Sequence, residues 1–164
     1  MVALMMMTVS VSAKDNSDND NDSESDVIKV VYPLDFADVK RVHFMLNTLN
    51  NVIKVYQKNF TEFDFSIVFY GPGLQYAMKD FNGTAYKEMP YIKHGGPTGK
   101  GTLGRMRALK QLAGDSLHFY VCGNTMKMKK VKKEQMFSFS EVTPTGIIKV
   151  IDLVRDGAVM IKIQ

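Results

Sequence analysis

Short apolar runs alternate with longer amphipathic segments along the chain from residue 27 onward. The runs are rich in β-branched and aromatic residues, a composition typical of buried strands. They predict five strands, at residues 27–32, 63–70, 116–121, 137–142 and 158–163. Between the strands, apolar positions recur every three or four residues, which predicts helices. We expect these helices at residues 37–58, 74–79 and 103–113, in a lysine-rich segment after Cys122, and from residue 147 to a C-cap at Gly157.

The order of these elements indicates the fold class. Strands that alternate with helices require right-handed crossover connections, and such connections produce a mainly parallel sheet with helices on both faces. Coverage of both faces also explains why the strand segments are apolar throughout rather than at every second position. We therefore predict an α/β fold, a three-layer sandwich with a mainly parallel sheet of about five strands, in one domain over residues 27–164.

The loops at the carboxyl ends of the predicted strands are the expected ligand site. Ligands of open parallel sheets bind beyond those ends, and here four loops should share one edge of the sheet. The loops lie at residues 33–35, 71–73, 122–125 and 143–146. We predict that they bind the ligand through small and polar residues, namely Gly71, Gly73, Asn124, Thr125, Thr145 and Gly146.

The only cysteine of the chain, Cys122, falls on this edge. A helix is expected directly after it, with Asn124 or Thr125 as N-cap, and a helix N-terminus favours thiolate over thiol. Five lysines between residues 127 and 133 add positive potential nearby. Because the thiolate is the nucleophilic form, Cys122 is the candidate catalytic residue. The alternative is a small buried hydrophobic residue without reactivity, beside lysines that form only a solvated helix face.

Composition and charge limit the classes of function. The net charge is +4, yet residues 14–26 carry six acidic residues and one basic residue, so the remainder holds 20 basic and 11 acidic residues. A basic body favours acidic partners or anionic ligands. Aromatic and basic residues do not interleave in the manner of a base-stacking surface, so we expect no nucleic-acid binding. A single cysteine excludes an intrachain disulfide, and no apolar run approaches the roughly 20 residues of a membrane span.

The first 26 residues are expected to lie outside the folded domain. Residues 1–13 are apolar and end in Val11-Ser12-Ala13, a pattern that suits signal-peptidase cleavage. The charged segment that normally opens a signal peptide is missing, which favours a signal peptide truncated at its start. The acidic, asparagine-rich tract at 14–26 is typical of a disordered linker. We therefore expect a periplasmic or otherwise exported protein with no membrane segment in its mature form, with a cytoplasmic location as the alternative.

Two further candidate sites are weaker. Residues 94–102, HGGPTGKGT, resemble a phosphate-binding loop, but His94 stands where that loop needs glycine and Gly101 stands where it needs serine or threonine. We interpret residues 90–104 as an insertion beside the sheet edge. Cys122, Met126 and Met128 form a soft-ligand set of the kind that Cu(I) prefers, but the methionine side chains should diverge. We predict no metal site and no cofactor.

Several segments together resemble the DsrE/DsrF-like, or sulfur-relay-like, proteins, and among them the exported bacterial proteins of the DsrE family. The segments are VVYPLD, IVFYGPGLQY, KDFNGTAY, LHFYVCGNTM and TPTGIIKVIDL, in this order. The resemblance implies an α/β homo-oligomer, a trimer or hexamer. It also implies that a cysteine after this strand carries sulfur as a persulfide, a role that maps onto Cys122. A sulfur donor or acceptor protein is then an expected partner.

Two hypotheses for function follow. The first is a sulfur-handling protein, a persulfide carrier or sulfur-relay-like protein that uses Cys122. The alternative is a non-catalytic oligomer with a small-ligand-binding or structural role, in which the cysteine is inert. Export would exclude a role in cytoplasmic tRNA thiolation, so only the chemistry of the thiol would be shared with the relay proteins.

The N-terminal pattern generates the first testable prediction. We expect the mature protein to begin near Lys14, because cleavage after Ala13 would remove the apolar stretch. N-terminal sequencing of the protein from its native host measures this directly. An intact Met1 on protein from a cytosolic fraction would contradict the prediction.

Overall fold

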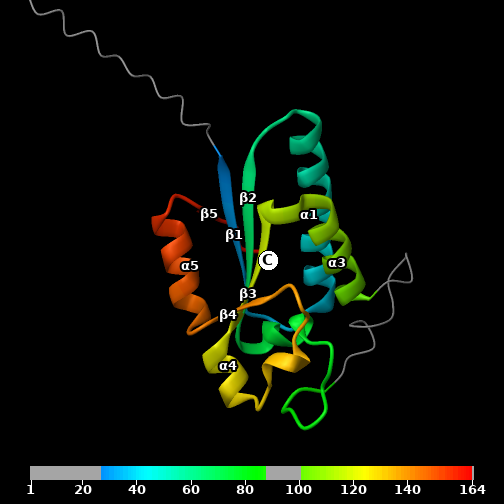
Figure 1. Cartoon of the computed structure of the whole chain (residues 1–164), viewed down its shortest axis with the longest axis vertical. Helices are drawn as coiled ribbons and strands as arrows, with labels where there is room; N and C mark the ends of the chain where they lie inside the picture. The colour runs from blue at the N-terminus through cyan, green and yellow to red at the C-terminus, as the bar shows by residue number, and fades with distance from the viewer. Residues whose placement is uncertain (1–26, 88–100, 164) are drawn as a thin grey trace, which may run out of the picture.

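A computed structural model describes residues 27–87 and 101–163, and in it a five-stranded sheet lies between two layers of helices (Figure 1). All strand pairs are parallel, and the order is β4-β3-β2-β1-β5. The strands are β1 (Ile28–Leu34), β2 (Phe63–Phe69), β3 (Leu117–Cys122), β4 (Glu141–Thr143) and β5 (Val159–Met160). This arrangement confirms the predicted α/β sandwich with its parallel sheet.

The helices divide unequally between the two faces of the sheet. Figure 1 shows α1 (Val39–Lys58) and α3 (Thr102–Ala113) on one face and α5 (Gly146–Arg155) on the other. The shorter helices are η1 (Gly71–Ala77), η2 (Gly114–Ser116), α4 (Gly123–Met128) and η3 (Lys133–Gln135). Among the helices of the described residues, none is both long and apolar enough to cross a membrane.

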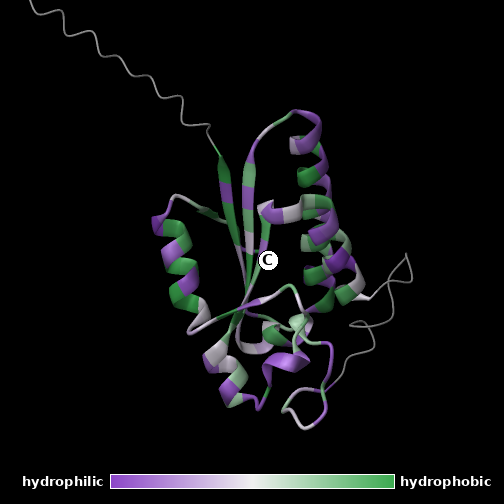
Figure 2. Ribbon diagram, in the orientation of Figure 1, coloured by the Kyte–Doolittle hydropathy of each residue, from purple (hydrophilic) through white to green (hydrophobic). Residues whose placement is uncertain are grey.

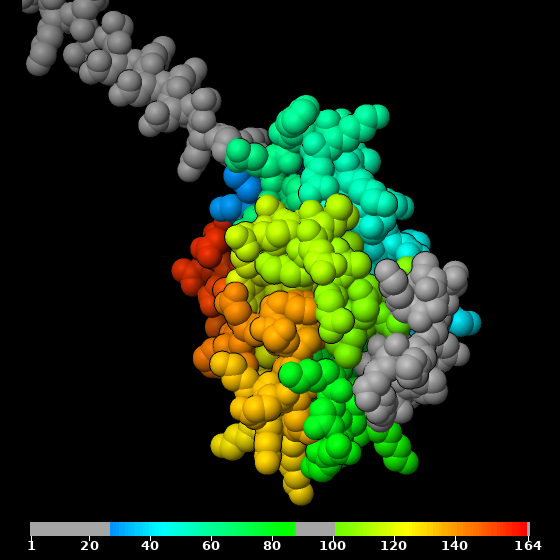
Figure 3. All heavy atoms as spheres, turned by 45° about the vertical axis from the view of Figure 1, so that its right-hand side comes forward, coloured from blue at the N-terminus to red at the C-terminus, as the bar shows by residue number. Residues whose placement is uncertain are grey.

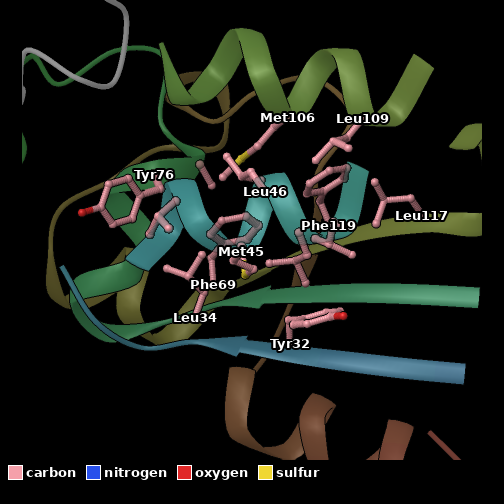
Figure 4. Packing of buried hydrophobic residues seen from close by; sticks show 14 of the residues in the cluster. Tyr32, Leu34, Met45, Leu46, Phe69, Tyr76, Met106, Leu109, Leu117 and Phe119 are labelled. Carbon is pink, nitrogen blue, oxygen red and sulfur yellow. The ribbon is translucent and has the colours of Figure 1, made fainter. Parts of the chain in front are cut away.

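The larger core fills the space between the sheet and the pair α1 and α3. In Figure 4, side chains of these helices, such as Leu46 of α1 and Met106 of α3, point toward the face of the sheet that carries aromatic residues such as Phe119 of β3. A smaller cluster lies under α5 and consists of Val31, Val68, Val150 and Ala158. Burial of each large apolar side chain contributes about 1.5–3 kcal/mol, so both faces of the sheet are stabilised by the same effect.

The register of the sheet places four strand ends at one edge. Leu34 of β1 pairs with Phe69 of β2, and Phe69 pairs with Val121 of β3. The next residue, Cys122, pairs with Thr143 of β4. The loops after these strands therefore leave from the same edge, as expected for parallel strands.

Three predicted elements differ in length or type. The strand predicted at 137–142 begins only at Glu141, because Phe137 and Phe139 instead form an aromatic cluster with Phe119, with ring centroids 5.5 and 5.2 Å from that ring. The strand predicted at 158–163 pairs with β1 only at Val159–Met160. The helix predicted at 74–79 is the 3-10 helix η1, which begins at Gly71.

The lysine-rich helix predicted after Cys122 is also shorter than expected. Helix α4 has six residues and ends at Met128, so it contains one of the five lysines, Lys127. Lys130 has a positive φ of 56°, which ends the helical backbone. The predicted C-cap, Gly157, is wrong by one residue: Asp156 caps α5, and Gly157 follows it with a φ of 92°.

Several apolar residues remain exposed on α5 and β5. Figure 2 shows hydrophobic residues along α5, at the outer side of the molecule. The exposed residues on α5 recur at helical spacing, and β5 adds apolar residues at the sheet edge: Ile147, Ile148, Ile151, Val154, Val159 and Met160. Single exposed apolar residues are ordinary, but a contiguous group is typical of a protein interface. This surface is the candidate interface for the expected homo-oligomer.

We predict that the α5 surface mediates self-association. The double substitution Ile148→Asp and Ile151→Asp should lower the molar mass measured by light scattering, because it introduces charges into an apolar interface. Val55→Asp, at a site on α1 that is equally exposed, is the matched control and should leave the mass unchanged. A wild-type protein that is monomeric at micromolar concentration would contradict the prediction.

Candidate functional site

Cys122 ends β3 and at the same time caps the helix that follows. Its backbone is extended, with φ −74° and ψ 110°, and its Sγ accepts a hydrogen bond from the Thr125 backbone N–H at 3.4 Å. The predicted N-caps, Asn124 and Thr125, are therefore wrong, because α4 begins at Gly123 and both residues lie within its first turn. The cysteine side chain is 4% exposed. The chain thus turns from strand to helix around the sulfur.

The surroundings of this sulfur favour its anionic form. Burial raises the pKa of the Cys122 thiol and is the largest single effect. Hydrogen bonds from the Thr125 side chain and from the backbone N–H groups of Thr125, Gly146 and Asn124 lower the pKa, and together they outweigh burial. The result is a thiol with a pKa below its ordinary value. Donors from two separate chain segments, the start of α4 and the start of α5, supply this stabilisation.

Thr125 connects the cysteine to the loop after β2. The backbone N–H of Gly71 donates to Thr125 Oγ1 at 3.1 Å. A threonine hydroxyl has one proton and two acceptor lone pairs, so accepting from Gly71 leaves its proton available for the Cys122 sulfur. Thr125 is 9% exposed, so water competes little for either bond. The loop at Gly71 therefore orients the hydroxyl toward the sulfur.

Tyr86 is a residue of this site that sequence reasoning missed. Its hydroxyl donates to the backbone oxygen of Gly71 at 2.5 Å. Burial, followed by the negative charge of Cys122, raises the pKa of Tyr86 to about 12. The phenol therefore stays protonated at neutral pH and remains a hydrogen-bond donor. Its segment carries no helical or strand periodicity, so the only signal in the sequence was the family motif KDFNGTAY.

The six predicted binding residues have different roles in the structure. Thr125 donates to the Cys122 sulfur and accepts from Gly71, and Asn124 and Gly146 lie near enough to lower the pKa of the Cys122 thiol. Gly73 and Gly146 permit close packing: a Cβ atom on Gly73 would lie 1.9 Å from the Leu34 backbone oxygen, and one on Gly146 would lie 2.8 Å from Tyr70 Cβ. Thr145 precedes α5 in an extended conformation without a side-chain capping bond. Ligand binding by these six residues stays a prediction.

The candidate soft-metal set does not assemble around Cys122. Met126 is buried at 6% exposure, whereas Met128 is 71% exposed. Within residues 27–87 and 101–163, no group of three or more histidine, cysteine, aspartate or glutamate residues could hold a metal ion. His118 instead lies with its Nε2 3.3 Å from Asp64 Oδ1. His94, and most of the glycine-rich segment and of the interpreted insertion, fall outside the described residues.

Comparison with known proteins places the chain in a family. The model of the DsrE/DsrF-like family matches residues 41–163. This chain belongs to the DsrE/DsrF-like family. A solved structure, titled "Structure of Protein of Unknown Function MTH1491 from Methanobacterium thermoautotrophicum", is similar, with a TM-score of 0.61 and 16% sequence identity. The match covers 82% of this chain and 98% of that one, and it shows a shared fold. No curated protein matches this chain.

The hydrogen bonds around Cys122 generate a prediction for this DsrE/DsrF-like protein. We expect Thr125→Val to raise the pKa of the Cys122 thiol, because valine keeps the shape but removes the hydroxyl donor. Thr125→Ser retains the donor and serves as the matched control. The rate of alkylation by a small uncharged reagent, measured against pH, should reach half its maximum below the ordinary thiol pKa of about 8.5 in the wild type.

The direction in which the alkylation curve moves along the pH axis shows whether the Thr125 hydroxyl stabilises the thiolate. The alkylation curve should move to higher pH in Thr125→Val and remain near that of the wild type in Thr125→Ser. A curve that stays in place in the valine variant would show that the hydroxyl does not stabilise the thiolate.

Proposed function

We propose that this protein is a sulfur carrier of the sulfur-relay type, in which Cys122 accepts and releases a sulfane sulfur. Membership of the DsrE/DsrF-like family supports sulfur-relay-like function in general. The observation that carries the finer proposal is the position of Cys122 at a parallel strand end, where the Thr125 N–H donates to its sulfur and neighbouring donors lower the pKa of its thiol. Such surroundings are typical of reactive cysteines rather than of cysteines that serve only in packing.

The loading step requires only a persulfide donor. The Cys122 thiolate attacks the outer sulfur of a donor R–S–SH, a new S–S bond forms at Cys122, and the S–S bond of the donor breaks. The donor leaves as the thiolate R–S⁻ with the electron pair of the broken bond, so no oxidant or reductant is consumed. The lowered pKa of Cys122 increases the thiolate fraction available for this attack.

The same donors assist the release step. An acceptor thiolate attacks the outer sulfur of the Cys122 persulfide, and the Cys122 sulfur leaves as a thiolate. The N–H group of Thr125 already donates to this atom, so it stabilises the charge that develops on the leaving group. Tyr86 keeps the Gly71 loop in place through its bond to the Gly71 oxygen. Loading and release thus use one set of fixed donors.

The low exposure of Cys122 favours a donor and an acceptor that present sulfur on a small or protruding group. A side chain that is 4% exposed cannot meet a flat protein surface without some opening of its surroundings. The same burial is also what the alternative function predicts, in which the cysteine is inert within an oligomer that has a structural or small-ligand-binding role. We further propose, from residues 1–13, that the carrier acts after export.

A direct test is intact-mass analysis of the folded protein after exposure to a low-molecular-weight persulfide. The wild type should gain the mass of one sulfur atom, and a thiol reductant should remove it. Cys122→Ser should gain none, which assigns the sulfur to Cys122. If folded protein gains no sulfur while unfolded protein does, Cys122 is inert in the native state and the carrier function is wrong.

A further inference from the structure

A group of lysines lies at the same end of the sheet as Cys122. Residues 127–133 contain five lysines and no acidic residue. Four of the lysines, Lys127, Lys130, Lys132 and Lys133, are exposed, and Lys129 is partly exposed. The ion pairs between described residues are those of Lys110 with Asp115 and His118 with Asp64, so the described part of the chain offers these lysines no acidic partner. We call residues 127–133 the lysine segment.

An exposed methionine lies within this group of charges. Met128 is 71% exposed, although it follows directly on the buried part of α4. Methionine is enriched at protein–protein interfaces, where apolar anchors are surrounded by polar rims. In Figure 3, residues of the lysine segment (gold) project from the lower end of the molecule, beside green atoms of the segment that contains Tyr86. The lysine segment therefore combines one exposed apolar side chain with several exposed positive charges.

The backbone of the lysine segment is fixed by hydrogen bonds rather than being a loose loop. The end of α4 forms a Schellman motif, with bonds from Val131 N–H to the Met126 oxygen at 2.9 Å and from Lys130 N–H to the Lys127 oxygen at 3.3 Å. Ala85 N–H donates to the Lys129 oxygen at 3.0 Å. A surface with a fixed backbone loses less conformational entropy on binding, so its charges are preorganised for a partner.

Lys130 occupies a position at which glycine would be more favourable. Its φ is 56°, in the left-handed region that residues with a Cβ atom adopt at a cost. Schellman motifs usually place glycine there. Lysine at this position costs stability and adds one more exposed positive charge to the segment. Unfavourable backbone conformations of this kind cluster at functional sites.

We infer that the lysine segment and Met128 form a docking surface for an acidic protein partner, which exchanges sulfur with Cys122. This inference rests on the proposed function and adds the chemical class of the partner. Nucleic acid is the less favourable occupant, because the segment holds no arginine and no aromatic residue on which a base could stack. The ring of Tyr86 is only partly exposed and has Lys129 Nζ 5.7 Å from its centroid.

The docking surface can be tested apart from the sulfur chemistry, in the Cys122→Ser background. The probe is a fluorescent glutamate-rich peptide with one central leucine, and its anisotropy measures binding at low ionic strength. Lys127→Gln with Lys133→Gln should weaken binding about fivefold. The matched control, Lys54→Gln with Lys58→Gln on the exposed side of α1, removes the same charge and should weaken binding less than about twofold.

Two single substitutions make the test sharper. Met128→Ser should weaken peptide binding without changing the net charge. Lys130→Gly should raise the midpoint of thermal unfolding by about 3 °C while it weakens binding, because glycine relieves the left-handed backbone but removes a charge. A lysine that is only structural would not produce opposite effects on stability and binding.

The outcomes separate the docking surface from the carrier function. If the double substitution in the lysine segment and the double substitution on α1 weaken peptide binding equally, the docking surface is wrong, because net charge alone would then explain binding. If a single-stranded oligonucleotide of equal charge binds more tightly than the peptide, and the double substitution in the lysine segment abolishes that binding, the acidic protein partner is wrong. Peptide binding that behaves as expected, in a protein whose Cys122 gains no sulfur, would support the surface and contradict only the proposed function.

Discussion

The parallel register of β1 to β4 is the constraint on which the candidate site depends. Because the strands run in one direction and their ends differ by at most one residue in register, the loops after Leu34, Phe69, Cys122 and Thr143 meet at one edge. Residues more than fifty positions apart in the sequence, such as Gly71 and Thr125, then come within hydrogen-bond distance. A shift of β3 by one residue would turn Cys122 to the opposite face and separate its sulfur from the amides.

Two opposing effects determine the chemical state of Cys122. Burial alone would make the thiol less acidic, as it does for a cysteine in a hydrophobic core. The strand ends directly before a helix, so the Thr125 N–H in the first turn donates to the sulfur, and the start of α5 brings the N–H of Gly146 near enough to lower the pKa of the thiol as well. The bonds outweigh burial because several fixed donors act on one atom. The site therefore needs the fold itself, and no single neighbouring charge accounts for it.

The sequence was sufficient for the features that local pattern and chain order determine. The apolar runs located all five strands, and their alternation with helices predicted the parallel sheet and the common edge. Helix α1 was predicted within two residues of its start, which Asp38 determines by accepting hydrogen bonds from the N–H groups of Lys40 and Arg41. The strand order also placed Cys122 at that edge, and the family match over residues 41–163 confirms the resemblance to the DsrE/DsrF-like family.

Contacts between distant segments account for what the sequence did not predict. Phe137 and Phe139 are good strand residues, but they stack on each other and pack edge-on against Phe119, which takes them out of β4. Cys122 replaced the expected N-caps because a sulfur atom can accept the capping bond when the helix starts immediately after the strand. Tyr86 reaches the site from a segment without periodicity, so only its hydrogen bond to Gly71 reveals it.

The most direct measurement of the central claim is the ionisation of Cys122 in the native protein. Thiolate absorbance in the ultraviolet, followed against pH, reports the single cysteine of the chain, with Cys122→Ser as the blank. We predict that the native thiol ionises at lower pH than the same thiol in unfolded protein, whose pKa should be about 8.5. A native thiol that ionises at the same pH as the unfolded one, or at higher pH, would contradict an activated Cys122.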